Sequence, residues 1–157
     1  MKCGITGKVC TFFGHSMFVN CRLNREVLKQ TIKDCILNGF VYFYVGCHGE
    51  FDNMVLNVCC ELKEKYDYIK IFVVLTSFGK NMLEKYSNSK EYKSIIFDIE
   101  NIHYKRRIEF SNKCMADKSD LIICFYDEDI ISGGTYKIFD YAKKQNKKII
   151  NLFNLKN

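Results

Sequence analysis

Two glycine-bearing turns hold the residues of this chain that are best suited to chemistry. Gly46 and Gly49 belong to the first turn, and Gly133 and Gly134 belong to the second. Each turn lies between an apolar run typical of a strand and a pattern typical of a helix. A glycine before a helix lets a ligand approach the backbone closely, and the unpaired amides at the positive helix end favour an anion. These turns therefore predict a phosphate-binding site.

Two interpretations stay open for the polar residues of these turns. Gly133, Gly134 and Thr135 form either an anion cradle or a tight turn with a helix cap. Asp52 is either the N-cap of the helix that follows it or a group that binds a ribose hydroxyl or orients a water molecule. His15 either contacts a ligand or serves as a structural hydrogen-bonding group.

Other reactive side chains give weaker signals. The acidic run 127–129 is either an exposed loop or the source of a catalytic carboxylate. Cys47 and His48 are adjacent, and adjacent side chains in an extended loop diverge, so a nucleophile–base pair is not expected. The histidines and cysteines lack the spacing of a zinc site, so no metal is predicted. The sequence does not identify a cofactor.

The totals are those of a soluble globular protein, with 157 residues that fit one domain over 1–157. Hydrophobic residues make up 48% and charged residues 27%, and no apolar stretch approaches the roughly 20 residues that cross a bilayer. The first residues lack the apolar core of a signal peptide. The nine cysteines are scattered, which favours reduced thiols and a cytoplasmic location. A membrane partner is not expected, because the chain lacks a long apolar stretch.

The net charge of +6 raises the question of a nucleic-acid partner. The lysines are intermixed with acids, and the densest run, 143–148, falls at the end of a predicted helix, where cations complement the helix dipole. A solvated helix end is therefore favoured over a surface for polyanions. Self-association into a homo-oligomer remains open.

Strand-like runs alternate with amphipathic segments along the chain. This alternation predicts an α/β fold, a Rossmann-like doubly wound and mostly parallel sheet with helices on both faces. Strands are expected at 8–13, 40–45, 69–75, 120–126 and 148–153, and helices at 25–38, 52–65, 105–117 and 134–145. Segment 76–104 has the weakest pattern, with one short apolar run at 94–97. Ligands of such sheets bind beyond the carboxyl ends of the strands, where the strand order reverses.

Taken together, the turns give a resemblance to the YpsA-like branch of the SLOG superfamily, Rossmann-type proteins related to the Lonely Guy phosphoribohydrolases and to the DNA-processing protein DprA. The residues that carry it are 10–15, 44–46, 49–52, 112, 115–120, 133–135 and 141–142. The resemblance implies a protein that binds a nucleotide or nucleotide-derived small molecule, as a sensor or a sequestering module. The ligand-binding residues expected on this basis are Gly14, His15, Gly46, Gly49, Asp52, Asn112, Gly133, Gly134 and Thr135.

The chain departs from the family pattern at three places. Relatives often carry arginines where Ser16 and Ser111 stand here, and Arg106 and Arg107 are the candidates to replace them. Phosphohydrolase-like relatives have a glutamate three residues past the threonine of the glycine turn, where this chain has Ile138. An N-glycosidase or nucleotide hydrolase, and a nucleic-acid-binding adaptor, therefore remain alternatives to a binding module.

Overall fold

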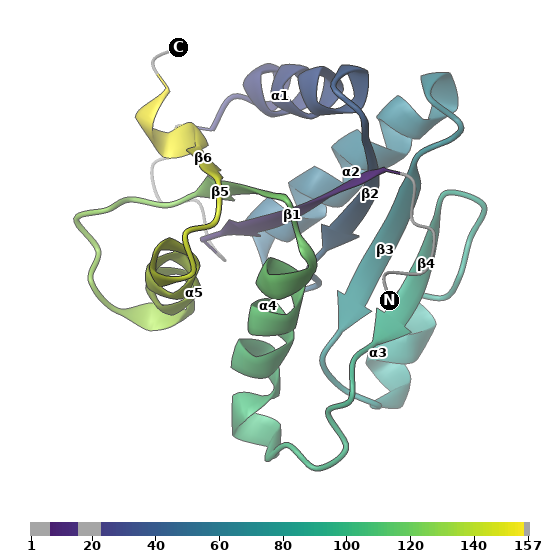
Figure 1. The fold of residues 1–157 in the computed structure, drawn as a ribbon. Helices are drawn as coiled ribbons and strands as arrows, with labels where there is room; N and C mark the ends of the chain where they lie inside the picture. Colours follow the sequence, from purple (N-terminus) through teal and green to yellow (C-terminus); the bar gives the residue numbers. More distant parts are fainter. Residues whose placement is uncertain (1–6, 16–22, 156–157) are drawn as a thin grey trace.

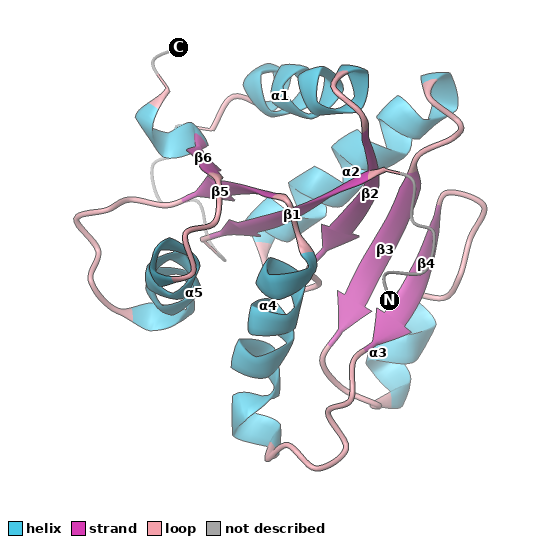
Figure 2. Ribbon diagram, viewed as in Figure 1, coloured by secondary structure: helices cyan, strands magenta, loops and turns pink. Residues whose placement is uncertain are grey.

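Six parallel strands form the central layer of the protein within residues 7–15 and 23–155, which are the residues that this computed structural model describes (Figures 1 and 2). They are β1 (Lys8–Gly14), β2 (Phe40–Val45), β3 (Lys70–Leu75), β4 (Tyr92–Ile96), β5 (Leu121–Phe125) and β6 (Ile149–Asn151). The strand order is β4-β3-β2-β1-β5-β6, and every pairing is parallel. The predicted Rossmann-like α/β fold is confirmed.

Helices cover both faces of this sheet. Figure 1 shows α1 (Arg25–Leu37) and α2 (Glu50–Lys65) on one face, and α4 (Arg107–Lys118) and α5 (Gly133–Lys144) on the other. The remaining helical segments are α3 (Lys80–Lys85) and the 3₁₀ turns η1 (Tyr104–Arg106) and η2 (Leu152–Asn154).

The alternation of side chains along β1 explains why both faces need a cover. Phe12 is fully buried in the cluster that α1 and α2 contribute to, whereas its neighbour Phe13 belongs to the cluster that includes Met115 of α4 and Ile138 of α5. Successive strand residues point to opposite faces, so a strand with apolar residues at adjacent positions, such as Phe12 and Phe13, must be buried on both. The continuous apolar run of β1 therefore creates two separate cores.

The helix boundaries follow local signals, with one correction. Asn24 caps α1, because its side chain accepts a hydrogen bond from the Glu26 amide at 2.9 Å. Of the two interpretations of Asp52, the N-cap role is wrong. Helix α2 begins at Glu50, two residues before the predicted start, with Gly49 as its N-cap and Asp52 already in the first turn.

The segment with the weakest pattern contains two regular elements. Helix α3 follows β3, and β4 pairs with β3 from Tyr92 to Ile96, which extends the expected apolar run at its start. The last strand is shorter than predicted and ends at Asn151. The Asn151 side chain accepts hydrogen bonds from the amides of Tyr126 at 3.1 Å and Phe153 at 3.2 Å, and the chain then turns into η2.

Candidate functional site

The strand order reverses beside β1, which pairs with β2 on one side and β5 on the other. In this register Thr11 is paired with Tyr44 and Gly14 with Phe125. The turns that follow these three strands therefore leave the same edge of the sheet side by side. The crevice at such a reversal is where open α/β sheets bind their ligands.

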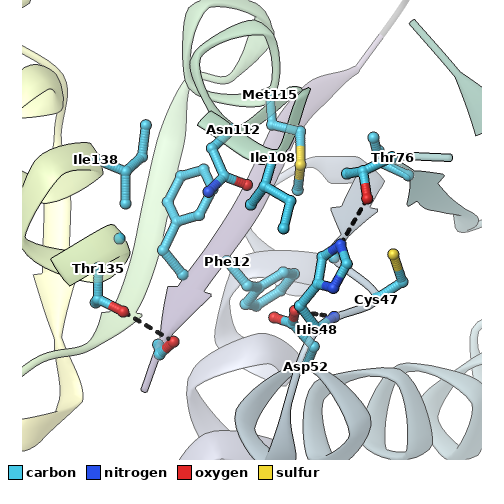
Figure 3. Close-up of a pocket in the computed structure, with 15 residues that line it drawn as sticks. Phe12, Cys47, His48, Asp52, Thr76, Ile108, Asn112, Met115, Thr135 and Ile138 are labelled. Carbon is cyan, nitrogen blue, oxygen red and sulfur yellow. Dashed lines mark hydrogen bonds between the residues drawn. The ribbon is translucent and has the colours of Figure 1, made fainter. Parts of the chain in front are cut away.

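A cavity of about 180 Å³ lies at this edge, and Figure 3 shows the side chains around it. It is bounded by the ends of β1, β2 and β3 on one side and by α4 and α5 on the other. Its lining consists of Phe12, Phe13, Gly14, Gly46, Cys47, His48, Asp52, Val74, Thr76, Ile108, Asn112, Met115, Gly134, Thr135 and Ile138. The structure thus brings together six of the nine predicted site residues, namely Gly14, Gly46, Asp52, Asn112, Gly134 and Thr135. His15, Gly49 and Gly133 do not line the cavity.

The glycines that line the cavity have different roles. A Cβ atom at Gly14 would overlap the Phe51 side chain, and one at Gly46 would lie against the Asp52 carboxylate. These two glycines therefore let the start of α2 pack closely against the strand ends. A Cβ atom at Gly134, in contrast, would meet no heavy atom within 4 Å. Among the glycines that line the cavity, Gly134 is therefore the one with open space beside its backbone.

Gly49 and Gly133 shape the turns from outside the cavity. Their φ angles are 100° and 90°, in the left-handed region that L side chains rarely adopt. Gly49 is the N-cap of α2, and Gly133 is the first residue of α5. Each therefore sets the direction in which the following helix leaves its turn.

The start of α5 offers amide groups to the cavity. Ser132 precedes the helix, and its side chain makes no capping hydrogen bond. The amide groups of the first turn are therefore hydrogen-bond donors without a side-chain cap. The Thr135 hydroxyl donates a hydrogen bond to the Gly14 carbonyl at 3.1 Å, which ties this helix end to β1 (Figure 3). The positive end of the helix dipole is thereby fixed at the mouth of the cavity.

The opposite end of the cavity is polar and partly acidic. Asp52 accepts a hydrogen bond from the His48 amide at 2.8 Å, and the His48 ring nitrogen Nε2 lies 2.6 Å from the Thr76 hydroxyl (Figure 3). Burial raises the pKa of Asp52 to about 7, although the His48 amide works in the other direction. Burial also lowers the pKa of His48, and Lys85 adds to that shift. At neutral pH this end therefore combines a neutral imidazole with a carboxyl group near its midpoint.

Cys47 is not an activated nucleophile. Its thiol lies 4.0 Å from the Met82 sulfur, and burial raises the pKa of Cys47 to about 11, with Asp52 adding to the shift. The neighbouring His48 ring is engaged with Thr76 instead. The side chains diverge as expected, and no nucleophile–base pair forms between them.

His15 takes a structural position. Its Nε2 accepts a hydrogen bond from the Asp127 amide at 3.1 Å, and its ring packs against the rings of Phe125 and Tyr126. Burial lowers the pKa of His15, while Asp127 opposes that shift. The histidine therefore holds the β5–α5 loop onto the end of β1. Ser16, which follows it, lies outside the described residues.

The cations expected to replace the missing arginines do not reach the cavity. The Arg107 guanidinium donates to the Ile102 carbonyl at 3.0 Å and lies 5.7 Å from the centre of the Phe78 ring. Arg106 lines no part of the cavity. Ser111 is fully buried, and its hydroxyl has no hydrogen-bond partner among the described residues.

Sequence reasoning missed His48 and Thr76 as parts of the site. Both come shortly after strand ends, His48 after β2 and Thr76 directly after β3. A position just beyond a strand's carboxyl end was the available signal. The apolar residues of the cavity wall could not be told from core residues by their sequence pattern. The main examples are Phe12, Ile108 and Ile138.

The acidic run 127–129 lies away from the cavity lining. Within it, the Asp129 amide donates to the Asp127 carboxylate at 3.0 Å. Over residues 7–15 and 23–155 no group of three or more His, Cys, Asp and Glu side chains is placed to hold a metal ion. The same ranges contain no helix that is both long and apolar enough to span a membrane.

Comparison with known proteins identifies the family. A model of the YspA SLOG family matches residues 15–156, so the chain belongs to this family, and the expected resemblance is confirmed. No curated protein matches the chain in sequence. Membership of the SLOG family indicates a nucleotide-related ligand that is bound or processed.

Proposed function

We propose that this SLOG-family protein binds a nucleotide or nucleotide-derived small molecule in the cavity at the carboxyl edge of its sheet, as a sensor or a sequestering module. The observation that supports this best is the polarity of the cavity. Uncapped amides of α5 stand at one end, and a buried carboxyl group with a histidine and a threonine stands at the other. A nucleotide has the same division into an anionic part and a hydrogen-bonding part.

The charges of the cavity support one orientation of the ligand. A phosphate belongs beside Gly134, where space is open and the helix end is positive. Asp52 repels a phosphate when it is ionised but accepts a hydrogen bond from a hydroxyl or amino group, such as those of a ribose or a base. Between the two ends, the exposed side chain of Ile108 offers apolar surface to a flat ring.

The expected affinity is moderate. Charge-assisted hydrogen bonds contribute about 1.5–3 kcal/mol each, so two or three of them reach the micromolar to millimolar range after the cost of association. Such an affinity suits a protein that responds to metabolite concentration.

Binding is favoured over hydrolysis by what stands at the place of the family's glutamate. Ile138 occupies that position and lines the cavity, whereas the nearest acid, Asp140, pairs with Lys144 at 2.7 Å. Among the lining residues within 7–15 and 23–155, Asp52 is the one carboxylate. A single buried carboxyl group lacks the partner that general acid–base cleavage usually employs.

A panel of nucleosides and nucleotides tests the proposal through thermal unfolding of the full chain. A bound ligand at a hundredfold excess over its Kd adds about 2.7 kcal/mol to the stability, which raises Tm by several degrees. We expect nucleotides to raise Tm more than the matching nucleosides. Chromatography of the same mixtures should show no released base. A panel without any shift in Tm would contradict binding, and released base would establish the hydrolase instead.

A further inference from the structure

A second cavity adjoins the first and lies between α4 and α5. Asn112, Gly134, Ile108 and Ile138 line both cavities, so the two are continuous at the start of α5. The residues that belong to the second cavity alone are Lys105, Glu109, Lys113 and Lys137. This α4–α5 groove therefore opens outward from the point where the proposed phosphate lies.

The size of the first cavity argues that the ligand enters the groove. Each of the two cavities measures about 180 Å³. Sites for small molecules typically measure about 300 Å³ or more. The first cavity alone is therefore too small for a complete nucleotide. A nucleotide that reaches Asp52 must extend past Gly134 into the groove.

The charge of the groove shows which part of the ligand lies there. Three lysines face one carboxylate, Glu109, which pairs with Lys113 at 3.1 Å. Lys105 and Lys137 are exposed and take part in no ion pair of 4.0 Å or less within residues 7–15 and 23–155. The groove thus has an excess of positive charge, whereas the inner end of the first cavity holds Asp52. This gradient favours a chain of negative charges that runs outward.

Asn112 stands at the junction of the two cavities. Its side chain points into the space beside Ile108 (Figure 3), and no hydrogen bond within the described residues engages its amide. An amide has two donors and one acceptor with two lone pairs. It is therefore free to donate to a phosphate oxygen that bridges the two cavities.

We propose that the groove holds the outer phosphates of a nucleoside polyphosphate, so that the protein selects di- and triphosphates over monophosphates. This inference rests on the proposed function and names its ligand class. The nucleoside occupies the inner cavity, the first phosphate lies at the start of α5, and the following phosphates lie along Lys105 and Lys137. Lys113 also contacts these phosphates when its ion pair with Glu109 opens.

Titration calorimetry of the full chain tests this selection. The probes are mono-, di- and triphosphates of the four common nucleosides together with inorganic tripolyphosphate, in EDTA and at constant ionic strength. We expect at least one triphosphate to bind about tenfold more tightly than its monophosphate, as one or two partly screened charge contacts predict. We also expect it to bind more tightly than tripolyphosphate, because the nucleoside fills the inner cavity.

The variant Lys105→Gln/Lys137→Gln should lower triphosphate affinity about tenfold and change monophosphate affinity less than about twofold. Its matched control is Lys70→Gln/Lys90→Gln, which removes the same charge beside the starts of β3 and β4, at the opposite edge of the sheet. The control should bind like the unaltered protein. Glu109→Gln should do the reverse of the lysine variant and tighten triphosphate binding, because it frees Lys113.

The outcomes separate this inference from the proposed function. Equal affinity for mono- and triphosphates would overturn the inference and leave nucleotide binding intact. A triphosphate preference that survives in the lysine variant would also overturn it. Tripolyphosphate that binds as tightly as the nucleotides would overturn the role of the nucleoside, and failure of every nucleotide to bind would contradict the proposed function itself.

Discussion

The side chain of Phe51 lies against the backbone of Gly14, so closely that no Cβ atom fits between them. Phe51 is fully buried near the start of α2, and Gly14 ends β1. This contact holds the first turn of α2 against the end of the central strand. The floor of the cavity therefore depends on a missing side chain at position 14.

Gly14→Ala should consequently destabilise the protein even when no ligand is present. Overpacking of a core costs about 1–3 kcal/mol, and the cost here falls at the upper end because the Phe51 side chain is enclosed. Urea unfolding measures the change. The double variant Gly14→Ala/Phe51→Leu should recover part of the loss relative to the sum of the two single variants. Strictly additive losses would show that the two residues do not interact as described.

Gly134→Asp should abolish nucleotide-induced stabilisation in a protein that still folds. The new carboxylate enters open space beside the first turn of α5 and repels the phosphate that we place there. Gly134→Asn is the matched control, since it has nearly the same shape without the charge. Thermal unfolding with the tightest nucleotide of the panel should show no shift for the aspartate variant and a substantial one for the asparagine variant. A normal shift in the aspartate variant would remove the phosphate from this position.

Asp52→Asn should stabilise the protein at high pH. The folded pKa of about 7 lies above the ordinary 3.8, so between these values the folded state holds a proton that the unfolded state lacks. Stability from this group therefore falls as pH rises from about 4 to 7, by up to about 4 kcal/mol.

Urea unfolding at several pH values checks this dependence on Asp52. The variant and the unaltered protein should be similar near pH 4 and diverge by pH 8, with the asparagine variant more stable. The lowered pKa of His48 affects both proteins alike, so the difference between them isolates Asp52. A constant difference across pH would refute the buried ionisation.

His15→Ala should loosen the β5–α5 loop and cost about 1 kcal/mol, the usual contribution of one hydrogen bond. The bond needs a neutral imidazole as acceptor, and the lowered pKa of His15 means that its contribution is present above the ordinary pKa of 6.5. It is lost as pH falls through the folded pKa. The cost of the substitution should therefore be larger at pH 7.5 than at pH 5.

His15→Gln serves as the control, because its amide oxygen can accept the Asp127 hydrogen bond. It should recover part of the stability and remove the pH dependence. Nucleotide affinity should follow the order of stability, with His15→Ala weakest. An alanine variant whose stability equals that of the unaltered protein would leave the histidine without the structural role described.

The fold was within reach of the sequence because its signals are local and repeated. Strands such as 40–45 are apolar at successive positions. Helices such as α1 have residues that mark their ends, in this case Gly39 with its positive φ angle. Segment 76–104 escaped because α3 is only six residues long and has no buried side chain. Such a helix lacks the apolar stripe on which sequence reasoning depends.

The site was only partly predictable. Gly14, Gly46 and Gly134 could be predicted as site residues because they lie in turns after strands. Their separate roles could not, because these depend on which side chains lie opposite them. Asp52 looked like a helix cap because the true cap, Gly49, lies three residues before the predicted helix start, and its position is set by a positive φ angle. Contacts between distant segments, such as Thr135 with Gly14, leave no trace in local spacing.

The central place of β1 has a consequence for the synthesis of the protein. β1 leaves the ribosome before β5, one of its two neighbours, which begins more than a hundred residues later in the chain. Until β5 and α5 have been synthesised, the nascent chain lacks one side of the crevice. It also lacks the start of α5, which is the helix end proposed to bind an anion. The proposed recognition of a metabolite is thus deferred until α5 has been synthesised, and chains that end before α5 should not bind it.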